Sequence, residues 1–508
     1  MEILNSLMTW IMKKRIHQIE LFMKYPSDVQ QELHRKLLST AQDTEFGRKY
    51  AFKDIKTYRD FQERVPISSY EDLFPYIDRL MKGEQNILWP TETKWFAKSS
   101  GTTNARSKFI PVSPEAIEDC HFKGGKDLLS IYCNNNPETK LFTGKSLAIG
   151  GSHQINQFDV NANSFYGDVS AVIMKNLPLW VQFVRTPSLE IALMDEWEAK
   201  IEKMAKVTSE ENVTNIAGVP TWTIVLIQRI VELKGAKNIL EVWPNLELFI
   251  HGAVAFGPYR QLFKELIPKK GMNYLETYNA SEGFFGIQDQ ANSGEMLLML
   301  DYGIFYEFIS MEALDDTHPK AIPLEEIEIG KNYAVVISTN AGLWRYMIGD
   351  TIKFTSKTPY RFKISGRTKH FINAFGEEVI VENAEKAIAY ACEQTGAIMS
   401  NFTAAPVYFE GAESKSKGGH EWIIEFIKKP ESLETFTDHL DTHLRSINSD
   451  YDAKRYKDLA LVKPIIHSVQ ENTFNEWMRS RGKLGGQNKV PRLSNTREYI
   501  DELLKMIS

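Results

Sequence analysis

The sequence predicts a two-part α/β protein, with a large layered N-terminal part and a smaller α+β unit at the C-terminal end. Three observations support this prediction. The 508 residues are enough for more than one packed core. Short apolar runs alternate with helix-like spacing between residues 145 and 300, which is typical of a layered α/β core. Beyond Gly366 the composition changes, which indicates a separate unit.

The first part of the chain, residues 1–80, is charged and rich in helical spacing. Apolar residues recur three and four positions apart in residues 30–41 and 70–81, which predicts two helices. Before them, the apolar stretch 4–12 is followed by the basic run 13–15. This order is the reverse of a secretory signal, so we expect a surface helix that docks on the core.

The middle of the chain alternates between strand-like and helix-like segments. Apolar runs at 146–149 and 246–250 predict strands, and residues 222–233 predict a helix. From residue 327 the composition changes to strand chemistry, with β-branched or apolar runs at 332–339 and 351–354. The residues expected to form the turns around these runs are Asn340, Gly342, Gly349 and Asp350.

The C-terminal segment reads as a small α+β unit. The predicted helices are 377–393, 434–447 and 473–480, and the predicted strands are 405–409, 422–428 and 459–466, with a polar loop at 411–419. We therefore predict two domains, residues 1–366 and 367–508.

Composition restricts the class of partner. The net charge of −6, with 43% hydrophobic and 25% charged residues, gives no electrostatic reason to expect nucleic acid or a membrane surface. No apolar run approaches the length of a membrane span. Cys120, Cys133 and Cys392 have scattered spacing, which supports neither a disulfide framework nor a zinc site. We expect a cytoplasmic monomer whose partners are small molecules.

A hydroxyl-rich run spans residues 99–112. It combines serine and threonine hydroxyls, a glycine that lets backbone N–H groups turn inward, and a lysine that offsets negative charge, which together suggest a phosphate-binding loop. The residues concerned are Ser99, Ser100, Gly101, Thr102, Thr103 and Lys108. The run is not a Walker sequence, and its composition also fits an ordinary exposed turn, so it must be judged with other motifs.

A second motif, residues 278–283, follows a possible strand. Its Tyr278 ring could lie against a purine, Ser281 could donate to a phosphate oxygen, and Glu282 could hold the magnesium that arrives with a nucleotide. One glutamate is enough for Mg²⁺ when phosphates supply the remaining ligands. An ordinary strand end is the alternative interpretation.

Three later motifs carry further candidate groups. Asp350 follows glycine where a strand is expected to run into a turn, and its carboxylate could accept two ribose hydroxyls. Residues 366–372 combine a glycine with cations, which fits either a hinge or a solvated linker. Lys489 lies in a glycine-rich loop, and it is either solvated or able to neutralise charge at an α-phosphate.

Taken in order, these motifs resemble the adenylate-forming superfamily, and most closely the auxin-responsive Gretchen Hagen three family of acyl acid amido synthetases. The resemblance covers nearly the whole chain, and further matching segments are 46–55, 61–70, 87–90, 218–220, 305–309 and 448–455. It implies a large adenylate-forming domain with a β-barrel-like portion and a small mobile C-terminal domain. Two positions depart from the family pattern, the segment 104–106, where many superfamily members carry further glycine, and Trp344, where tyrosine is more common.

The resemblance also implies the roles of individual residues. Ser99–Thr103 and Lys108 would form the phosphate loop, Gly252 and Ala253 would line the adenine pocket, and Asp350 would hold the ribose. The remaining implied positions are Tyr278, Asn279, Ser281 and Glu282 at adenylate and metal, Arg367 at the hinge, and Lys489 as the mobile catalytic lysine.

The implied reaction joins a small carboxylic acid to the amine of an amino acid, with ATP and Mg²⁺ as cofactors. The acid is first activated as acyl-adenylate, and the amine then displaces AMP. Two alternatives remain open at this point. An acyl-CoA ligase would use the same adenylation step with a thiol acceptor, and a nucleotide-binding regulator would have kept the fold without the reaction.

Overall fold

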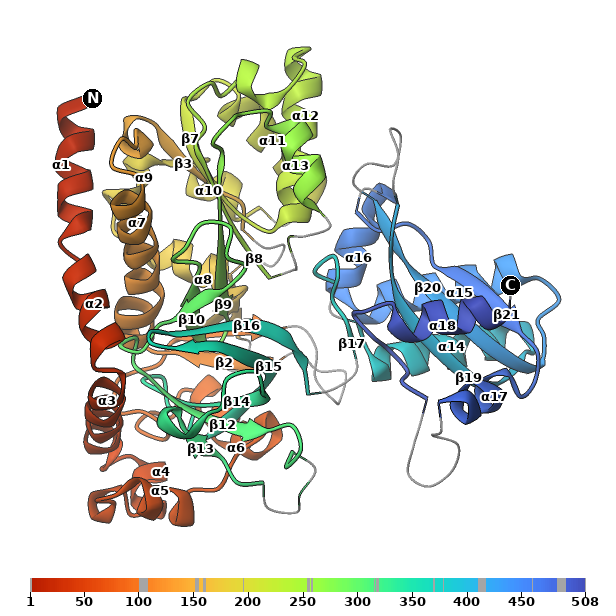
Figure 1. Cartoon of the computed structure of the whole chain (residues 1–508), viewed down its shortest axis with the longest axis horizontal. Coiled ribbons are helices and arrows are strands. Elements are labelled where there is room, and N and C mark those ends of the chain that lie inside the picture. The colour runs from red at the N-terminus through yellow and green to blue at the C-terminus, as the bar shows by residue number, and fades with distance from the viewer. Residues whose placement is uncertain are drawn as a thin grey trace.

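The computed structural model has a large part, which carries the N-terminal residues, and a smaller C-terminal unit beside it (Figure 1). This arrangement confirms the predicted α/β fold class. The residues that the structure describes are 2–99, 108–150, 155–158, 161–194, 196–253, 256, 259–314, 316, 319–368, 371–377, 379–409, 417–458, 460–481 and 490–507.

Helices from the N-terminal segment run along one side of the large part (Figure 1). The first three are α1 (Glu2–Lys13), α2 (Ile16–Lys24) and α3 (Pro26–Ala41). Helix α1 docks on the core as expected, because the Asn5 amide donates to Thr139 O at 2.9 Å and accepts from Phe142 N at 3.0 Å.

Helices α4 (Glu45–Lys49), α5 (Tyr58–Arg64) and α6 (Tyr70–Met81) follow. Helix α6 has the predicted bounds, and a capping box explains its first residue. Ser69 accepts from Asp72 N, and the Asp72 carboxylate accepts from Ser69 N in return. Helix α5 begins in the same way at Thr57.

The central sheet of the large part has twelve strands, in the order β13-β12-β14-β15-β16-β11-β10-β9-β8-β7-β3-β6. Strands β9, β8, β7, β3 and β6 pair in parallel, and the others pair antiparallel. Within the described residues the antiparallel strands pair in a linear order that does not close on itself. The strands are β3 (Lys145–Ala148), β6 (Arg185–Thr186), β7 (Val213–Ala217), β8 (Leu248–Gly252), β9 (Asn273–Ala280), β10 (Gly283–Ile287), β11 (Met296–Leu298), β12 (Ile304–Ser310), β13 (Ile322–Pro323), β14 (Asn332–Thr339), β15 (Tyr346–Lys357) and β16 (Tyr360–Arg367).

A second sheet, β2-β1-β5-β4, packs in the large part and was not predicted. Its strands are β1 (Trp95–Ser99), β2 (Lys108–Val112), β4 (Asn156–Phe158) and β5 (Asn161–Gly167). The remaining α-helices of this part are α7 (Lys123–Asn135), α8 (Val169–Asn176), α9 (Val181–Val184), α10 (Leu189–Ala192), α11 (Trp197–Thr208), α12 (Pro220–Lys234) and α13 (Arg260–Leu266). Within the described residues, no helix has the length and apolar content needed to cross a bilayer.

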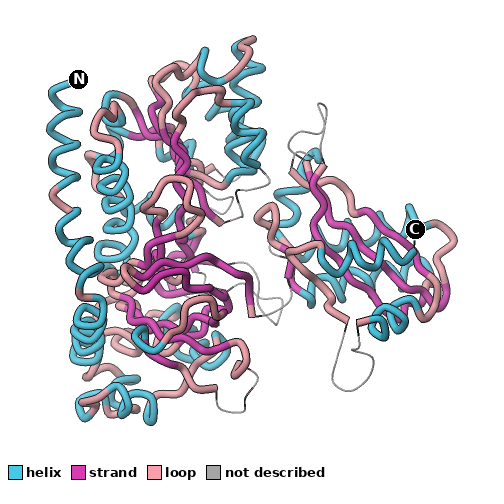
Figure 2. The backbone as a smooth tube through the Cα atoms, in the orientation of Figure 1, coloured by secondary structure: helices cyan, strands magenta, loops and turns pink. Residues whose placement is uncertain are grey.

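The C-terminal unit contains the sheet β19-β20-β21 with helices packed against it (Figure 2). Its elements are β17 (Phe371–Ile372), β18 (Val379–Ile380), α14 (Val381–Thr395), β19 (Ile398–Tyr408), β20 (Gly418–Lys428), α15 (Leu433–Ile447), α16 (Ser449–Arg455), β21 (Ile465–Val469), α17 (Thr473–Ser480) and α18 (Glu498–Ile507). The predicted helix 473–480 is α17, whereas α18 was missed.

The large part and the C-terminal unit pack against each other. Tyr259 of the large part donates to Ala374 O at 2.8 Å, and one cluster of buried apolar residues continues from the parallel sheet into the C-terminal unit. The position of the domain boundary at residue 366 stays a prediction.

Two sequence expectations were wrong. The strand expected at 459–466 is β21 at Ile465–Val469, because Pro464 has no N–H for a ladder and the strand starts after it. The expected turn at Gly349 and Asp350 lies inside β15 instead, because β14 and β16 pair with that strand on both sides. Gly349 has φ +93°, which only glycine adopts readily, so its conformation bends the strand without ending it.

Candidate active site

Tyr278 and Asp350 meet across the central sheet. The Tyr278 hydroxyl, on β9, donates a hydrogen bond to the Asp350 carboxylate on β15. The Tyr278 ring is buried, with its centroid 4.8 Å from that of Phe285. Asp350 is also the strand partner of Arg367 on β16. Tyr278 and Asp350, which are 72 positions apart in the sequence, therefore lie together, and the backbone of Arg367 lies beside Asp350.

Tyr346 is a site residue that the sequence analysis missed. Lys108 Nζ, at the start of β2, donates to the Tyr346 hydroxyl at 3.3 Å. Burial raises the pKa of Tyr346 well above its usual value, and the charges of Glu282 and Asp350 contribute in the same direction. The phenol therefore stays protonated, with Lys108 beside it and the carboxylates of Glu282, Glu71 and Asp350 acting on it.

Glu282 and Ser281 form the turn between β9 and β10, and both are partly exposed. The turn closes on Gly283, where an added Cβ would lie 2.6 Å from Ile304 Cδ1, so a side chain there would make the Ile304 side chain shift. Next to the turn, Asn279 Oδ1 lies 3.1 Å from His121 Nδ1. Burial lowers the pKa of His121 to about 4, so its neutral ring donates to the Asn279 oxygen.

Gly252 and Ala253 lie at the carboxyl end of β8, between β7 and β9. In parallel sheets this edge is where ligands bind. An added Cβ at Gly252 would lie 2.5 Å from Thr277 O on β9, and Ala253 has a left-handed φ of +69°. Their assignment to the adenine pocket stays a prediction.

The predicted phosphate loop is described only at its ends. Ser99 ends β1 and Lys108 begins β2, and the two residues are partners in an antiparallel pair. The predicted loop residues Ser100, Gly101, Thr102 and Thr103, together with Lys489, lie outside the described residues. The side chain of Arg367 also lies outside them.

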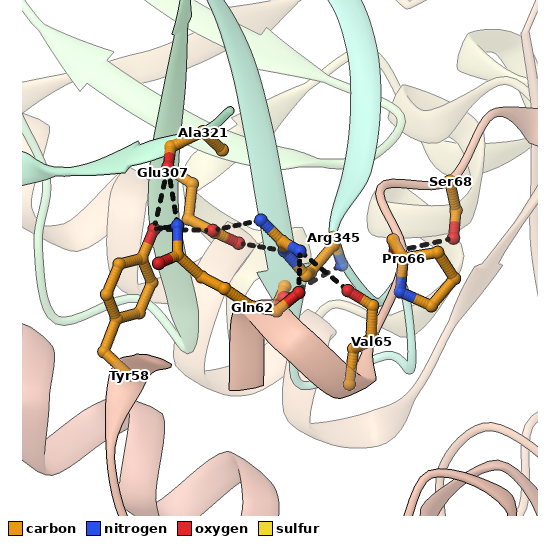
Figure 3. Close-up of polar contacts among 9 residues, drawn as sticks. Tyr58, Gln62, Val65, Pro66, Ser68, Glu307, Ala321 and Arg345 are labelled. Atoms are coloured by element: carbon orange, nitrogen blue, oxygen red, sulfur yellow. Dashed lines mark hydrogen bonds and ion pairs between the residues drawn. The ribbon is translucent and has the colours of Figure 1, made fainter. Parts of the chain in front are cut away.

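A buried polar network behind β15 fixes the strand that carries Tyr346 and Asp350 (Figure 3). Arg345 donates to Glu307 through Nε at 3.0 Å and Nη2 at 2.9 Å, and through Nη1 to Val65 O at 2.7 Å. Its backbone O accepts from Ser68 N at 2.8 Å, and Arg345 has a left-handed φ of +43°. The network ties the loop after α5 to the first residues of β15.

Trp344, the position that departs from the family pattern, lies in the core. Its Nε1 donates to Leu88 O at 3.1 Å, and its ring centroid is 4.6 Å from that of Phe52.

A cavity of about 460 Å³ lies away from the predicted site, where α3 faces β12 and β13, and none of the predicted site residues lines it. No group of three or more histidine, cysteine and acidic side chains suited to a metal occurs in the described part of the chain.

The arrangement brings opposite charges to one place. Lys108 is at the mouth of the predicted phosphate loop, and the carboxylates of Glu282 and Asp350 act on the same phenol that Lys108 contacts. A lysine beside a hydroxyl-rich loop suits phosphate, and a carboxylate suits a divalent cation or a pair of hydroxyls.

Comparison with known proteins relates the chain to one family. Residues 15–272 match the GH3 family N-terminal domain, 297–367 its central domain and 382–498 its C-terminal domain. The indole-3-acetic acid-amido synthetase GH3.3 of Arabidopsis thaliana is 23% identical, over 94% of this chain and 91% of that protein. The jasmonoyl–L-amino acid synthetase JAR4 of Nicotiana attenuata is 25% identical, over 80% of each chain.

Solved structures agree in fold. The GH3.15 acyl acid amido synthetase in complex with 2,4-DB has a TM-score of 0.62 at 17% identity, covering 97% of this chain and 96% of that one. The 2-hydroxyisobutyryl-CoA ligase in its thioesterification state has a TM-score of 0.56 at 13% identity, covering 95% and 92%. With three successive domains matched over most of its length, the chain belongs to the GH3 family.

Proposed function

We propose that this protein is an ATP-dependent ligase that joins a small carboxylic acid to the amine of an amino acid. The acid attacks the α-phosphate of ATP to give acyl-adenylate and pyrophosphate, and the amine then displaces AMP to form an amide. The convergence of Lys108, Tyr346 and Asp350 beside the ends of the hydroxyl-rich loop is the observation that carries this proposal. The GH3 relatives described above are synthetases that act on indole-3-acetic acid and on jasmonate with amino acids, and this supports the proposal.

In this proposal the nucleotide lies across the sheet. Asp350 accepts the two ribose hydroxyls, and the Tyr278 hydroxyl orients the Asp350 carboxylate for them. Gly252 and Ala253, at the end of β8, line the adenine pocket. Asn279 and Ser281 supply further polar contacts to the adenylate.

The phosphates of ATP bind to the hydroxyl-rich loop and to the lysine that follows it. Ser99 to Thr103 offer hydroxyl and backbone N–H groups, and Lys108 supplies a positive charge. The donor set fits a magnesium ion at Glu282, because a partly exposed carboxylate beside a phosphate loop is one of the few protein ligands Mg²⁺ needs. When bound, the ion neutralises charge on the pyrophosphate leaving group.

Lys489 acts as the mobile cation of the adenylation step, and Arg367 belongs to the hinge on which the C-terminal unit rotates between the half-reactions. Neither step requires a covalent enzyme intermediate, because the adenylate supplies the leaving group. The chain therefore contributes orientation and charge stabilisation.

The test is acid-dependent exchange of labelled pyrophosphate into ATP, with indole-3-acetate, 4-hydroxybenzoate and jasmonate as first probes. Asp350→Ala should raise the ATP Kd about 10–100-fold, because the ribose hydroxyls lose a charged acceptor. Asp438→Ala, at an exposed ion pair with Lys463, is the control and should bind ATP normally. An unchanged ATP Kd in Asp350→Ala would contradict the role of Asp350 in binding the ribose.

The acceptor is settled by offering amino acids and CoA separately to the preformed adenylate. Amide formation supports the proposal, and faster thioester formation would make the protein an acyl-CoA ligase. ATP binding without pyrophosphate release across a wide panel of acids would make it a regulator.

A further inference from the structure

One lysine of the C-terminal unit is buried against the large part. Lys454, on α16, is 2% exposed, and its Nζ lies 3.8 Å from the ring centroid of Trp222. Trp222 is in the first turn of α12, which follows the carboxyl end of β7. In Figure 1, α16 is on the side of the C-terminal unit that faces the large part. The ammonium thus reaches the edge of the sheet where ligands bind.

A second element of the large part reaches the same lysine. Asp168, the residue before α8, acts electrostatically on Lys454. Asp168 follows the end of β5, where Gly167 is the parallel partner of Ala97, two residues before Ser99. Lys454 therefore lies between the first turn of α12 and the strand that leads into the predicted phosphate loop.

Burial makes the neutral amine of Lys454 accessible near pH 7. Burial lowers its pKa to about 7, against the opposing charges of Asp450 on its own helix, Glu377 and Asp168. Glu377 is itself buried and lies 2.7 Å from His420 Nε2. Near pH 7 a substantial fraction of the molecules then carries an unprotonated lysine, which is the state of a general base.

The proposed reaction needs such a group. An amino acid in water near pH 7 carries an ammonium, which has no lone pair with which to attack an acyl-adenylate. A residue near the acceptor must take one proton before the C–N bond forms. None of the residues assigned above to the nucleotide serves this purpose.

We propose that Lys454 is the general base of the amide-forming half-reaction, accepting a proton from the ammonium of the acceptor amino acid. The freed amine attacks the acyl carbon, the C–N bond forms, and the bond between that carbon and the phosphate oxygen breaks. The second proton on nitrogen leaves with the AMP phosphate, and Lys454 returns its own proton to water. This inference rests on the proposed function.

The test separates the half-reactions and the acceptors. Lys454→Arg keeps the cation over Trp222 but removes the base, and Lys454→Met removes both. Hydroxylamine is a suitable second acceptor, because it is largely unprotonated at pH 7 and needs no base. Lys463→Met, at an exposed lysine of the same unit, is the matched control.

In both Lys454 variants, transfer to the best of the twenty amino acids should fall about 10²–10⁴-fold, while transfer to hydroxylamine and acid-dependent pyrophosphate exchange stay within about threefold. The wild-type transfer rate should rise with pH through about 7 for the amino acid and not for hydroxylamine. Lys454→Arg should lose the inflection near pH 7, because its remaining rate follows only the free-amine fraction of the acceptor, which keeps growing with pH.

Restored amino-acid transfer in Lys454→Arg would show that only the positive charge matters and would overturn the inference. An equal loss with hydroxylamine would do so as well, because it would indicate a structural role at the contact between the two parts. Failure of the proposed function is distinguishable, since the wild-type protein would then show no acid-dependent pyrophosphate exchange at all.

Discussion

Breaking the ion pair of Arg345 and Glu307 should be among the most destabilising single changes in the large part. The Arg345 side chain is 4% exposed and that of Glu307 is 0% exposed, and two hydrogen bonds join them. Arg345→Met leaves the Glu307 carboxylate buried, with the Tyr58 hydroxyl at 2.8 Å as its one remaining hydrogen-bond partner among the described residues. It also orphans Val65 O. Removing one partner of a buried pair costs about 3–5 kcal/mol.

Urea denaturation of the full chain, followed by tryptophan fluorescence, measures this cost. Arg59→Met, which breaks an exposed pair with Glu63, is the control and should cost less than about 1 kcal/mol. The double variant Glu307→Gln/Arg345→Met should recover part of the loss, because no buried charge is left unpaired. A loss below about 1 kcal/mol in Arg345→Met would refute the reasoning.

The same network positions the first residues of β15, so further predictions concern the site itself. Tyr278→Phe should raise the ATP Kd about 3–10-fold, measured by calorimetry, because the Asp350 carboxylate loses its orienting hydroxyl. Lys489→Ala should slow pyrophosphate exchange roughly 10²–10³-fold with little change in ATP affinity; normal exchange would remove its role. Burial lowers the pKa of His251 to about 3, below its unfolded value, so its contribution to stability is full above about pH 6.5 and falls as the pH drops. Between pH 7 and pH 5 the free energy of unfolding, measured by urea titration, should therefore fall by about 2 kcal/mol more in the wild type than in His251→Leu. An equal fall in both proteins would contradict the lowered pKa of His251.

Elements with strong local signals could be predicted from the sequence. Helix α6 has both an apolar stripe and a capping box at Ser69, so local and tertiary preferences agree on its bounds. Strand β14 was predicted from a β-branched run and is buried at all but its first position. Such segments can be predicted without knowing which elements they pack against.

Elements that depend on distant partners could not be predicted as well. Gly349 and Asp350 have the composition of a turn. They lie in a strand because Asp350 pairs with Arg367 on β16, and because the residues on either side, Met347 and Thr351, pair with β14 across a bulge. Strands β1 and β5 pair although more than 50 residues separate them, and short strands of mixed composition carry little periodicity.

The same contrast between local sequence signals and distant partners applies to the candidate site. Tyr278, Glu282 and Asp350 were found because motifs and a family resemblance mark them. Tyr346 is one of 20 tyrosines and was missed. Strand periodicity could not have found it, because the left-handed φ of Gly349 and the bulge in the pairing with β14 interrupt the alternation between Tyr346 and Asp350.

The fate of the carboxylate oxygen of the acid tests the central claim most directly. An acid labelled with heavy oxygen in its carboxylate is incubated with the protein, ATP, Mg²⁺ and the amino acids, and the products are weighed by mass spectrometry. The account predicts that one labelled oxygen appears in the phosphate of AMP for each amide formed, because the acyl group leaves an adenylate. Label in inorganic phosphate, or amide formation with unlabelled AMP, would contradict it.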